Sequence, residues 1–208
     1  LLEQTWLALE DAGQRIEDLR GSSTGVFVGI CNSDYARDAT AADEPYGATG
    51  NAISIAANRV SYAFDLRGPS LAIDTACSSS LVAVDLACRS LWSGESQQAI
   101  AAGVNLVLAP ALSHNLARAG FLAADGRCRA FAADAGGYVR GEGCGVILLE
   151  PLSRARALGR RIYAVIRGSA VNSDGRSNGL TAPSVSAQAA VLRAAHQHAG
   201  VAGHELGY

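Results

Sequence analysis

Cysteine is the residue type most capable of covalent chemistry in this 208-residue sequence, and the pattern around Cys77 is typical of a nucleophile. The segment 70–74 before it predicts a short strand, and the segment 78–92 after it predicts a helix. A tight turn between such elements lifts a side chain out of the sheet edge, toward the N–H groups and positive dipole end of the helix. That setting favours the thiolate form of a cysteine, and the backbone N–H of Cys77 would donate to a developing oxyanion.

Small neighbours leave room for a substrate arm beside Cys77, because residues 75, 76 and 78–80 are threonine, alanine and serine. The helix at 78–92 is apolar around nearly all of its surface, which is typical of a helix at the centre of a fold. A buried packing thiol is the alternative, since that is the commonest state of a free cysteine, and the spacing leaves both interpretations open. The other four cysteines lack a strand–turn–helix setting and are interpreted as structural: Cys31, Cys88, Cys128 and Cys144.

The elements that must position Cys77 alternate between strand and helix patterns along the chain. Apolar runs predict strands at 24–30, 70–74, 99–108, within 138–150 and at 162–171. Helical spacing and stop residues predict a helix ending at Gly13 and helices at 51–64, 78–92, 112–119, 154–158 and 184–199, with a polar loop at 31–48 and a turn at 67–69. The alternation favours an α/β fold whose helices cover a largely buried sheet. The connector around 151–160 is the best candidate for a domain boundary in this sequence. Both ends of the sequence are expected to continue into a longer chain.

The composition, with 49% apolar and 17% charged residues, is typical of a soluble globular protein. A net charge of −2 without a basic run argues against nucleic acid and anionic membranes as partners. The longest apolar stretch, at 99–112, is shorter than the ~18 residues that a membrane span needs. No signal peptide precedes the first helical segment, and five cysteines without a C-x-x-C pair favour a reduced, cytoplasmic protein.

The segment around Cys77, DTACSSSLVAVDLACRSLWSGE, resembles the active-site segment of the ketosynthases (β-ketoacyl synthases) of type I modular polyketide synthases. Similar strings lie along the whole chain: LLEQTWLALEDAG, NRVSYAFDLRGPSLAID, AAGVNLVLAP, DGRCRAF, GYVRGEGCGVILLEPLSRARALG and IRGSAVNSDGRSNGLTAP. The resemblance implies a thiolase-like fold with αβαβα layers. It implies that 1–158 is the N-terminal half with the nucleophile, and that 159–208 is the truncated start of the C-terminal half. It also implies a Cys-His-His triad in which Cys77 is the nucleophile and both histidines lie beyond Tyr208.

The reaction that the resemblance implies is the decarboxylative Claisen condensation of polyketide or fatty-acid biosynthesis, catalysed by an acyltransferase-type enzyme. Cys77 takes an acyl group from the phosphopantetheine of an acyl carrier protein, and a malonyl-type extender on a second carrier protein supplies the carbanion. No metal or dissociable cofactor is expected. The implied partners are carrier-protein, acyltransferase and other domains of the same megasynthase, and a second copy of the chain, paired through strand 99–108. Without the histidine motifs, residues 1–208 are not expected to catalyse condensation.

Some features depart from this pattern or compete with it. Ala132 and Gly136 stand where the family usually has aspartates, and Asp134 is a partial substitute, so we expect local effects on the loop before GYVRGEG. The turn at 140–143 lacks the Lys-Ser/Thr of a P-loop and is interpreted as structural, whereas the polar loop at 172–183 would be functional if it borders the substrate entrance. The four histidines lie outside the family's histidine motifs and are expected at the surface: His114, His196, His198 and His204.

A rival function is that of a non-catalytic thiolase-fold partner, which shapes a dimer or sets chain length. Such proteins resemble ketosynthases but replace the nucleophile, so the intact TACSSS turn argues against this function. A decarboxylating loading domain carries glutamine at the position of Cys77, and the cysteine excludes it.

Overall fold

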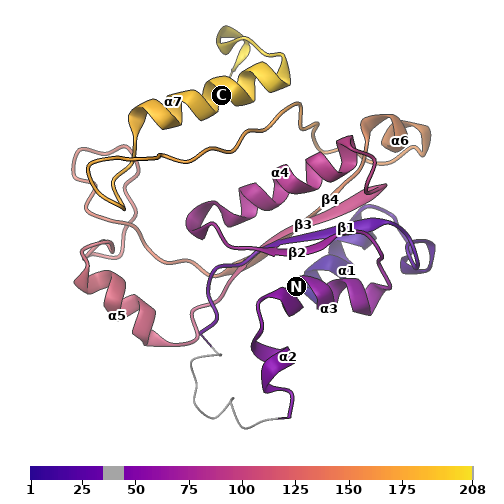
Figure 1. Ribbon diagram of the computed structural model, residues 1–208, viewed down its shortest axis with the longest axis horizontal. Coiled ribbons are helices and arrows are strands. Elements are labelled where there is room, and N and C mark those ends of the chain that lie inside the picture. Colours follow the sequence, from indigo (N-terminus) through magenta and orange to yellow (C-terminus); the bar gives the residue numbers. More distant parts are fainter. Residues whose placement is uncertain (35–44, 208) are drawn as a thin grey trace. The chain divides into compact units, whose positions relative to one another are not determined.

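The computed structural model describes residues 1–34 and 45–207, and the chain divides into two compact units, Leu1–Leu149 and Glu150–Tyr208. Among the described residues of the first unit, four strands form one sheet in the order β2-β1-β3-β4 (Figure 1). Strands β1 (Thr24–Gly29), β2 (Ser70–Ile73) and β3 (Gln98–Asn105) are parallel, and β4 (Gly143–Leu149) pairs with β3 in the antiparallel direction. The first unit is therefore a mixed α/β layer structure, which confirms the predicted fold class.

Helices cover both faces of this sheet (Figure 1). Helix α4 (Ser79–Trp92) packs on one face, where Phe27 meets Ala83 and Ala87 in one apolar cluster. On the opposite face, α1 (Leu2–Asp11) and α3 (Ser54–Phe64) contribute to a second cluster with Val26, Val28 and Ile100 of the strands: Leu9, Ala57, Val60 and Phe64. Successive strand residues thus point into different clusters, and β1 is buried along its whole length. The sheet is buried on both faces at its centre, as the continuous apolar runs predict.

Helix α1 ends as its sequence predicts. Gly13 has a φ of +63°, its N–H donates to the carbonyl of Glu10 at 2.9 Å, and the N–H of Gln14 donates to the carbonyl of Leu9 at 2.9 Å. These two bonds form a Schellman motif, which satisfies carbonyls at the helix end and needs a left-handed residue that glycine adopts without strain.

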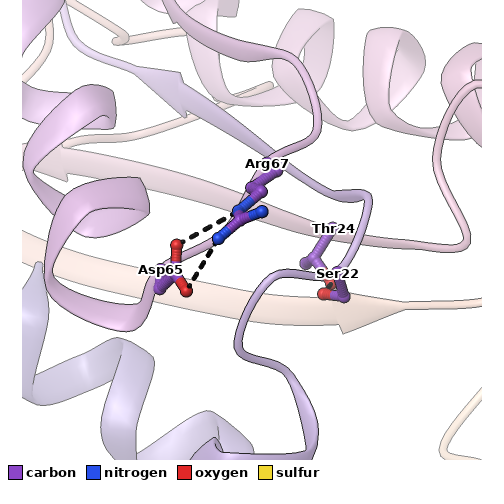
Figure 2. Close-up of polar contacts among 4 residues, drawn as sticks. All are labelled: Ser22, Thr24, Asp65 and Arg67. Atoms are coloured by element: carbon purple, nitrogen blue, oxygen red, sulfur yellow. Dashed lines mark hydrogen bonds and ion pairs between the residues drawn. The ribbon is translucent and has the colours of Figure 1, made fainter.

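The turn between α3 and β2 fixes β2 beside β1 (Figure 2). Helix α3 ends at Phe64. Its C-cap, Asp65, has a φ of +50°, and the Asp65 carboxylate accepts a 3.3 Å hydrogen bond from Nε of Arg67. The N–H of Arg67 donates to the carbonyl of Ser22 at 2.8 Å, just before β1. A Cβ on Gly68 would lie 2.6 Å from the carbonyl carbon of Thr24, so the turn at 67–69 requires glycine to approach β1 this closely.

Several predicted boundaries shift. The predicted loop at 31–48 includes residues 35–44, which lie outside the described residues, and its end forms helix α2 (Gly47–Asn51). The predicted helix at 51–64 begins at Ser54, because Ala52 has extended backbone angles that interrupt it. The predicted helix at 112–119 is α5 (Pro110–Arg118), which begins with proline at its first position.

Strand β3 has hydrogen-bonded neighbours on both of its edges, which corrects the predicted dimer contact. The predicted strand at 99–108 ends at Asn105; it pairs with β1 on one side and with β4, from Ala99 to Asn105, on the other. A strand with two neighbours has no free N–H or C=O groups for a twofold mate. Pairing of two copies through this strand is therefore wrong, and the described sheet has its edges at β2 and β4.

The second unit contains helices α6 (Leu152–Ala157) and α7 (Val185–Ala199) and the 3₁₀ turn η5 (Gly203–Glu205). Helix α7 begins at the N-cap Ser184, whose Oγ accepts from the N–H of Ala187 at 3.3 Å, and α6 corresponds to the predicted connector helix.

The strand predicted at 162–171 is wrong, because no regular strand forms there in the described chain. A strand needs a neighbour to satisfy its backbone groups, and within the second unit this segment instead passes close to the end of α7. A Cβ on Gly168 would lie 2.5 Å from the backbone nitrogen of Ala199. Our division of the chain at residue 158 stays a prediction. No helix within residues 1–34 and 45–207 is long and apolar enough to cross a bilayer.

Candidate active site

Cys77 lies in a one-turn 3₁₀ segment, η4 (Ala76–Ser78), between the end of β2 and the start of α4. Its side chain is exposed, so the alternative of a buried packing thiol is wrong. Ala76 before it has a φ of +54°, a left-handed conformation that a residue with a Cβ rarely adopts. The predicted strand–turn–helix arrangement is confirmed, and the turn holds its strained residue next to the thiol.

Side chains of the turn itself hold this conformation. The N–H of Ala76 donates to Oδ1 of Asp74 at 3.0 Å, an Asx-type bond across two residues. The hydroxyl of Ser78 lies 2.9 Å from both the carbonyl oxygen and Oγ1 of Thr75. These bonds occupy backbone groups that the tight turn would otherwise leave without partners.

Two glycines let the start of α4 rest directly on the sheet. A Cβ on Gly29, the last residue of β1, would lie 2.5 Å from the backbone nitrogen of Ser80. A Cβ on Gly103 of β3 would lie 2.7 Å from Cβ of Ser80. Neither glycine has a positive φ, so close packing and not backbone conformation explains them. The height of the turn above the sheet is therefore set by direct contact with β1 and β3.

A cavity of about 1060 Å³ lies beside Cys77 within the first unit. The ends of β1, β3 and β4, the first turns of α4 and part of α5 surround it, together with the segment 138–143. Its apolar lining includes Leu81, Val84, Leu112, Leu116 and Ile147. A cavity of this size and lining suits an acyl chain of several carbons next to the thiol.

The segment 140–143 forms one wall of this cavity and is tied to the end of β3. The carbonyl of Gly141 accepts from Nδ2 of Asn105 at 2.6 Å, and Oε1 of Glu142 accepts from the N–H of Val107 at 2.6 Å. Nη1 of Arg140 donates to Oγ of Ser113 on α5 at 2.7 Å. The predicted turn at 140–143 does not form, because residues 140–142 have no regular structure and Gly143 begins β4. The place of this segment on the cavity wall could not be seen in the sequence, because its partners lie 27 to 36 residues away.

Family models match nearly the whole chain in two consecutive segments. Residues 1–155 match "Beta-ketoacyl synthase, N-terminal domain", and residues 163–208 match "Beta-ketoacyl synthase, C-terminal domain". The chain belongs to the β-ketoacyl synthase family. The resemblance that the sequence motifs indicate is thereby confirmed.

Curated relatives of this chain are much longer proteins. It is 54% identical over 211 residues to a phenolphthiocerol/phthiocerol polyketide synthase of Mycobacterium tuberculosis, in a match that covers 100% of this chain and 11% of that protein. It is 50% identical over 204 residues to the phthioceranic/hydroxyphthioceranic acid synthase of Mycobacterium bovis, in a match that covers 97% of this chain and 10% of that protein. The chain thus spans about a tenth of the length of these curated relatives.

Solved structures of ketosynthases have the same fold. The oxazolomycin ketosynthase domain of Streptomyces albus JA3453 superposes with a TM-score of 0.92 at 42% identity, covering 100% of this chain and 36% of that one. The ketosynthase from module 6 of the bacillaene synthase of Bacillus subtilis 168 gives a TM-score of 0.87 at 40% identity, covering 96% and 34%. The thiolase-like fold expected from the resemblance is therefore confirmed for the part of the fold that this chain spans.

A second thiol, Cys31, lines the same cavity, although its sequence setting indicates a structural residue. Cys31 follows β1, and the N–H of Ile30 donates to the carbonyl of Ile73 at 3.0 Å, so the ends of β1 and β2 lie side by side. Burial raises the pKa of the Cys31 thiol, and the nearby Asp74 and Cys77 raise it further. A raised pKa keeps Cys31 protonated at neutral pH, which makes it a poor nucleophile. The adjacent strand ends were the available clue, since residues that follow neighbouring parallel strands meet at one sheet edge.

The remaining cysteines lie in other settings. Cys88 is buried in α4, and its burial, with Asp85 nearby, raises the pKa of the thiol. Cys128 is exposed on the loop after α5, and Cys144 is half-buried on β4, where it pairs with Val104. None of these three lines the described cavity, and their interpretation as structural residues stays a prediction.

Among the residues of the first unit that line the cavity, His114 does not appear. His114 is exposed on α5, and His204 is exposed in η5. On α7, His196 is half-buried, and Nδ1 of the exposed His198 lies 2.9 Å from the carbonyl oxygen of Ser169. The expected surface position holds for three of them, and His196 is partly covered because it lies on another face of α7.

The loop before β4 carries the two departures from the family pattern. Asp134 forms an ion pair with Nε of Arg129 at 3.3 Å, and Arg129 also pairs with Asp125. A Cβ on Gly136 would have the carbonyl oxygen of Asp134, at 3.9 Å, as its nearest neighbour, so the structure has room for a larger side chain there. Asp134 thus pairs with a neighbouring arginine. That Asp134 substitutes for the aspartates missing at Ala132 and Gly136 stays a prediction.

The polar loop at 172–183 is tied to α7 within the second unit. Nδ2 of Asn172 donates to the carbonyl of Ala187 at 2.8 Å, and Oδ2 of Asp174 accepts from the N–H of Ser184 at 3.2 Å. Its position at a substrate entrance stays a prediction. Within the described residues, no group of three or more His, Cys, Asp or Glu side chains is arranged to hold a metal ion.

Proposed function

We propose that this chain is the acyl-accepting part of a ketosynthase that forms carbon–carbon bonds in polyketide or fatty-acid biosynthesis, with Cys77 as the nucleophile. One observation carries the proposal. In a chain of the β-ketoacyl synthase family, Cys77 is an exposed thiol in a strained turn at the start of α4, beside a largely apolar cavity of about 1060 Å³. Accessibility, a helix N-terminus and room for an acyl chain are what acyl transfer to a thiol requires.

In the first half-reaction, the Cys77 thiolate attacks the thioester carbonyl of an acyl group carried on phosphopantetheine. The tetrahedral oxyanion accepts a hydrogen bond from the backbone N–H of Cys77, and its collapse expels the phosphopantetheine thiolate, which takes up a proton. The product is an acyl thioester on Cys77. Splitting the reaction in this way separates acyl transfer from bond formation.

In the second half-reaction, a malonyl-type extender on a carrier protein loses its carboxylate as carbon dioxide. The electron pair of the broken bond forms an enolate, whose carbon attacks the acyl-Cys77 carbonyl and expels the thiolate. The histidines that would stabilise the enolate belong to segments outside this sequence. No dissociable cofactor is needed, because both substrates arrive on phosphopantetheine.

Carrier-protein domains and the acyltransferase and other domains of one megasynthase are the proposed partners. The relatives support this proposal, since the phenolphthiocerol/phthiocerol polyketide synthase and the phthioceranic/hydroxyphthioceranic acid synthase are each about ten times as long as this chain. We also propose a homodimer of the complete domain, which would contact its partner elsewhere than along β3, because both edges of β3 are occupied.

Acyl loading of single-cysteine variants tests the assignment of Cys77. In a full-length protein that carries this chain, Cys77→Ala is expected to abolish acylation of the ketosynthase by an acyl-carrier protein, detected by mass spectrometry. Cys88→Ala and Cys144→Ala are the matched controls and are expected to load normally, because neither thiol lines the cavity. Undiminished acylation of the Cys77→Ala domain would refute the assignment.

A protein of residues 1–208 is expected to lack condensing activity. Its Cys77 would still accept an acyl group slowly, since the helix N-terminus supports the thiolate without a histidine. Decarboxylation would fail, because no group is proposed in this sequence to stabilise the enolate. The assay is product formation from an acyl donor and malonyl-carrier protein. Turnover would show that our account of the second half-reaction is wrong.

A further inference from the structure

We propose that Ser79 is a positioning residue for Cys77: its hydroxyl group sets the orientation of the peptide bond that carries the Cys77 N–H. The inference rests on the proposed function, in which Cys77 is the acyl acceptor and its N–H stabilises the oxyanion. In this inference, Ser79 neither reacts nor touches the reacting atoms. It fixes the geometry of Cys77, which does react.

The Ser79 hydroxyl bridges the two sides of the strained residue. Oγ of Ser79 accepts a hydrogen bond from the N–H of Thr75 at 3.0 Å and donates to the carbonyl oxygen of Ala76 at 2.7 Å. The backbone N–H of Ser79 donates to the same carbonyl of Ala76. Ala76, whose φ is +54°, is thus enclosed by bonds that end on a single serine.

The Ala76 carbonyl matters because it shares a peptide group with the N–H of Cys77. A trans peptide is planar, so its C=O and N–H point in opposite directions. Two hydrogen bonds from Ser79 hold the Ala76 oxygen toward the helix, and they therefore direct the Cys77 N–H away from Ser79. In the proposed reaction, this N–H is the donor to the oxyanion, and such a donor is effective when its orientation is fixed in advance.

Ser79 is itself held in place, so it can act as a fixed point. Its relative exposure is 5%, although the adjacent Ser78 and Ser80 are exposed. A Cβ on Gly29 would lie 2.6 Å from the carbonyl carbon of Ser79, so the Ser79 backbone rests on the end of β1. Because the buried Ser79 hydroxyl both accepts and donates a hydrogen bond within the turn, it holds the turn in its conformation.

The test compares substitutions at position 79 that differ in the hydroxyl group. Ser79→Ala removes the hydroxyl, while Ser79→Thr and Ser79→Val have nearly the same shape as each other and differ in that group. The measurement, in a full-length protein that carries this chain, is the single-turnover rate of acyl transfer from hexanoyl-pantetheine to Cys77. Alkylation of Cys77 by iodoacetamide, which needs no oxyanion donor, reports whether the thiol remains accessible.

We expect Ser79→Ala and Ser79→Val to slow acyl transfer roughly ten- to hundredfold, the effect of a small misplacement in an active site, while iodoacetamide alkylation stays near the wild-type rate. Ser79→Thr should keep most of the acyl-transfer rate, because a threonine hydroxyl can make both bonds. Ser93→Ala is the matched control: at the other end of α4, Oγ of Ser93 donates to the carbonyl of Ser90 at 3.1 Å, and its loss should leave acyl transfer unchanged.

Wild-type acyl transfer in Ser79→Ala and Ser79→Val would overturn the inference and leave the proposed function intact. Equal losses in Ser79→Thr and Ser79→Val would also overturn it, since shape and not the hydroxyl would then matter. Acylation of the wild-type protein at a residue other than Cys77 would instead refute the proposed function. If Ser79→Ala does not fold, hydrogen exchange of the wild-type protein decides: a slowly exchanging Thr75 amide supports the bridge, and free exchange overturns it.

Discussion

Similar apolar sequence patterns form different structures in the two units of this chain. In the first unit, apolar runs at β1 and β3 become strands with hydrogen-bonded neighbours, and their side chains enter two buried clusters. In the second unit, the equally apolar run at 162–171 forms no regular strand in the described chain, and Ile162, Val165 and Val171 are exposed. The difference shows that an apolar segment with high β propensity forms a strand where a neighbouring strand can hydrogen-bond to its backbone.

The candidate site depends on this difference, because its geometry comes from the paired strands. The turn at Cys77 rests on Gly29 and Gly103, which belong to the two strands at the centre of the sheet. In the second unit, the described contacts are instead those of loops with a single helix, such as the bond between Asn172 and the carbonyl of Ala187 in α7. A rigid nucleophile turn is thus built in the unit whose backbone groups are most completely paired.

Hydrogen exchange should give the largest contrast between the units. In a protein of residues 1–208, amides of β1 and β3 are expected to exchange orders of magnitude more slowly than amides of 163–171, because the former open with the global unfolding of the unit. Mass spectrometry of peptic fragments after exchange measures this difference. Equal protection of 163–171 would mean that this segment pairs as a strand, and the comparison would fail.

A matched pair of isoleucine substitutions should separate the units by stability. Ile100→Ala is expected to lower the free energy of unfolding by about 2–5 kcal/mol, because Ile100 is 1% exposed and packs in the cluster beneath β3. Ile166→Ala should change it by less than about 0.5 kcal/mol, because that side chain is 38% exposed. Denaturant titration of the two variants measures both values. Similar losses would contradict the assignment of the packed core to the first unit.

A glycine pair tests the close contact beneath Cys77. Gly29→Ala is expected to destabilise the protein by about 1–3 kcal/mol, because the new methyl group would lie 2.5 Å from the backbone of Ser80. In the second unit, Gly179→Ala should be nearly neutral, since the nearest atom to a Cβ there is Cβ of Ala182 at 4.0 Å. Thermal unfolding compares the two variants. An unaffected Gly29→Ala protein would show that α4 does not rest on β1 as described.

The pH dependence of thiol alkylation should give the smallest effect, within the first unit. Raised pKa values mean that Cys31 and Cys88 hold less thiolate at pH 8 than an ordinary thiol, so both should react with iodoacetamide more slowly than the exposed Cys128. Their rates should continue to increase with pH beyond the point at which an ordinary thiol is fully ionised. The control is the denatured protein, in which all three should react alike. Early levelling of Cys31 would show that its cavity does not favour the protonated thiol.

The sequence predicts the local elements of the site well and its long-range contacts poorly. The end of α1 at Gly13, the turn at 67–69 and the placement of Cys77 between β2 and α4 all follow from residues close together in the chain. The antiparallel pairing of β3 with β4 does not, because strand order and direction depend on partners that are far apart in the chain, from Asn105 with Gly143 to Ala99 with Leu149. The position of Cys31 near Cys77 follows once β1 and β2 are taken as parallel neighbours, because their ends then meet at one sheet edge.

The dimer prediction failed for a related reason. The apolar character of 99–108 indicates burial on both faces, but it does not say whether another strand of the same chain or a second copy occupies each edge. Strand β4 occupies one edge and β1 the other. The prediction of helix boundaries was also wrong in places. Ala52 has an extended backbone that separates α2 from α3, although alanine favours helices.

The most direct test of the central claim locates the acyl group in the unmodified protein. A full-length protein that carries this chain would be incubated with an acyl-carrier protein, digested, and its acylated peptide sequenced by mass spectrometry. The account predicts the acyl group on Cys77, the exposed thiol of the strained turn, and an unmodified Cys31 in the same cavity. An acyl group on Cys31, with Cys77 free, would contradict the claim that the turn at the start of α4 makes the nucleophile.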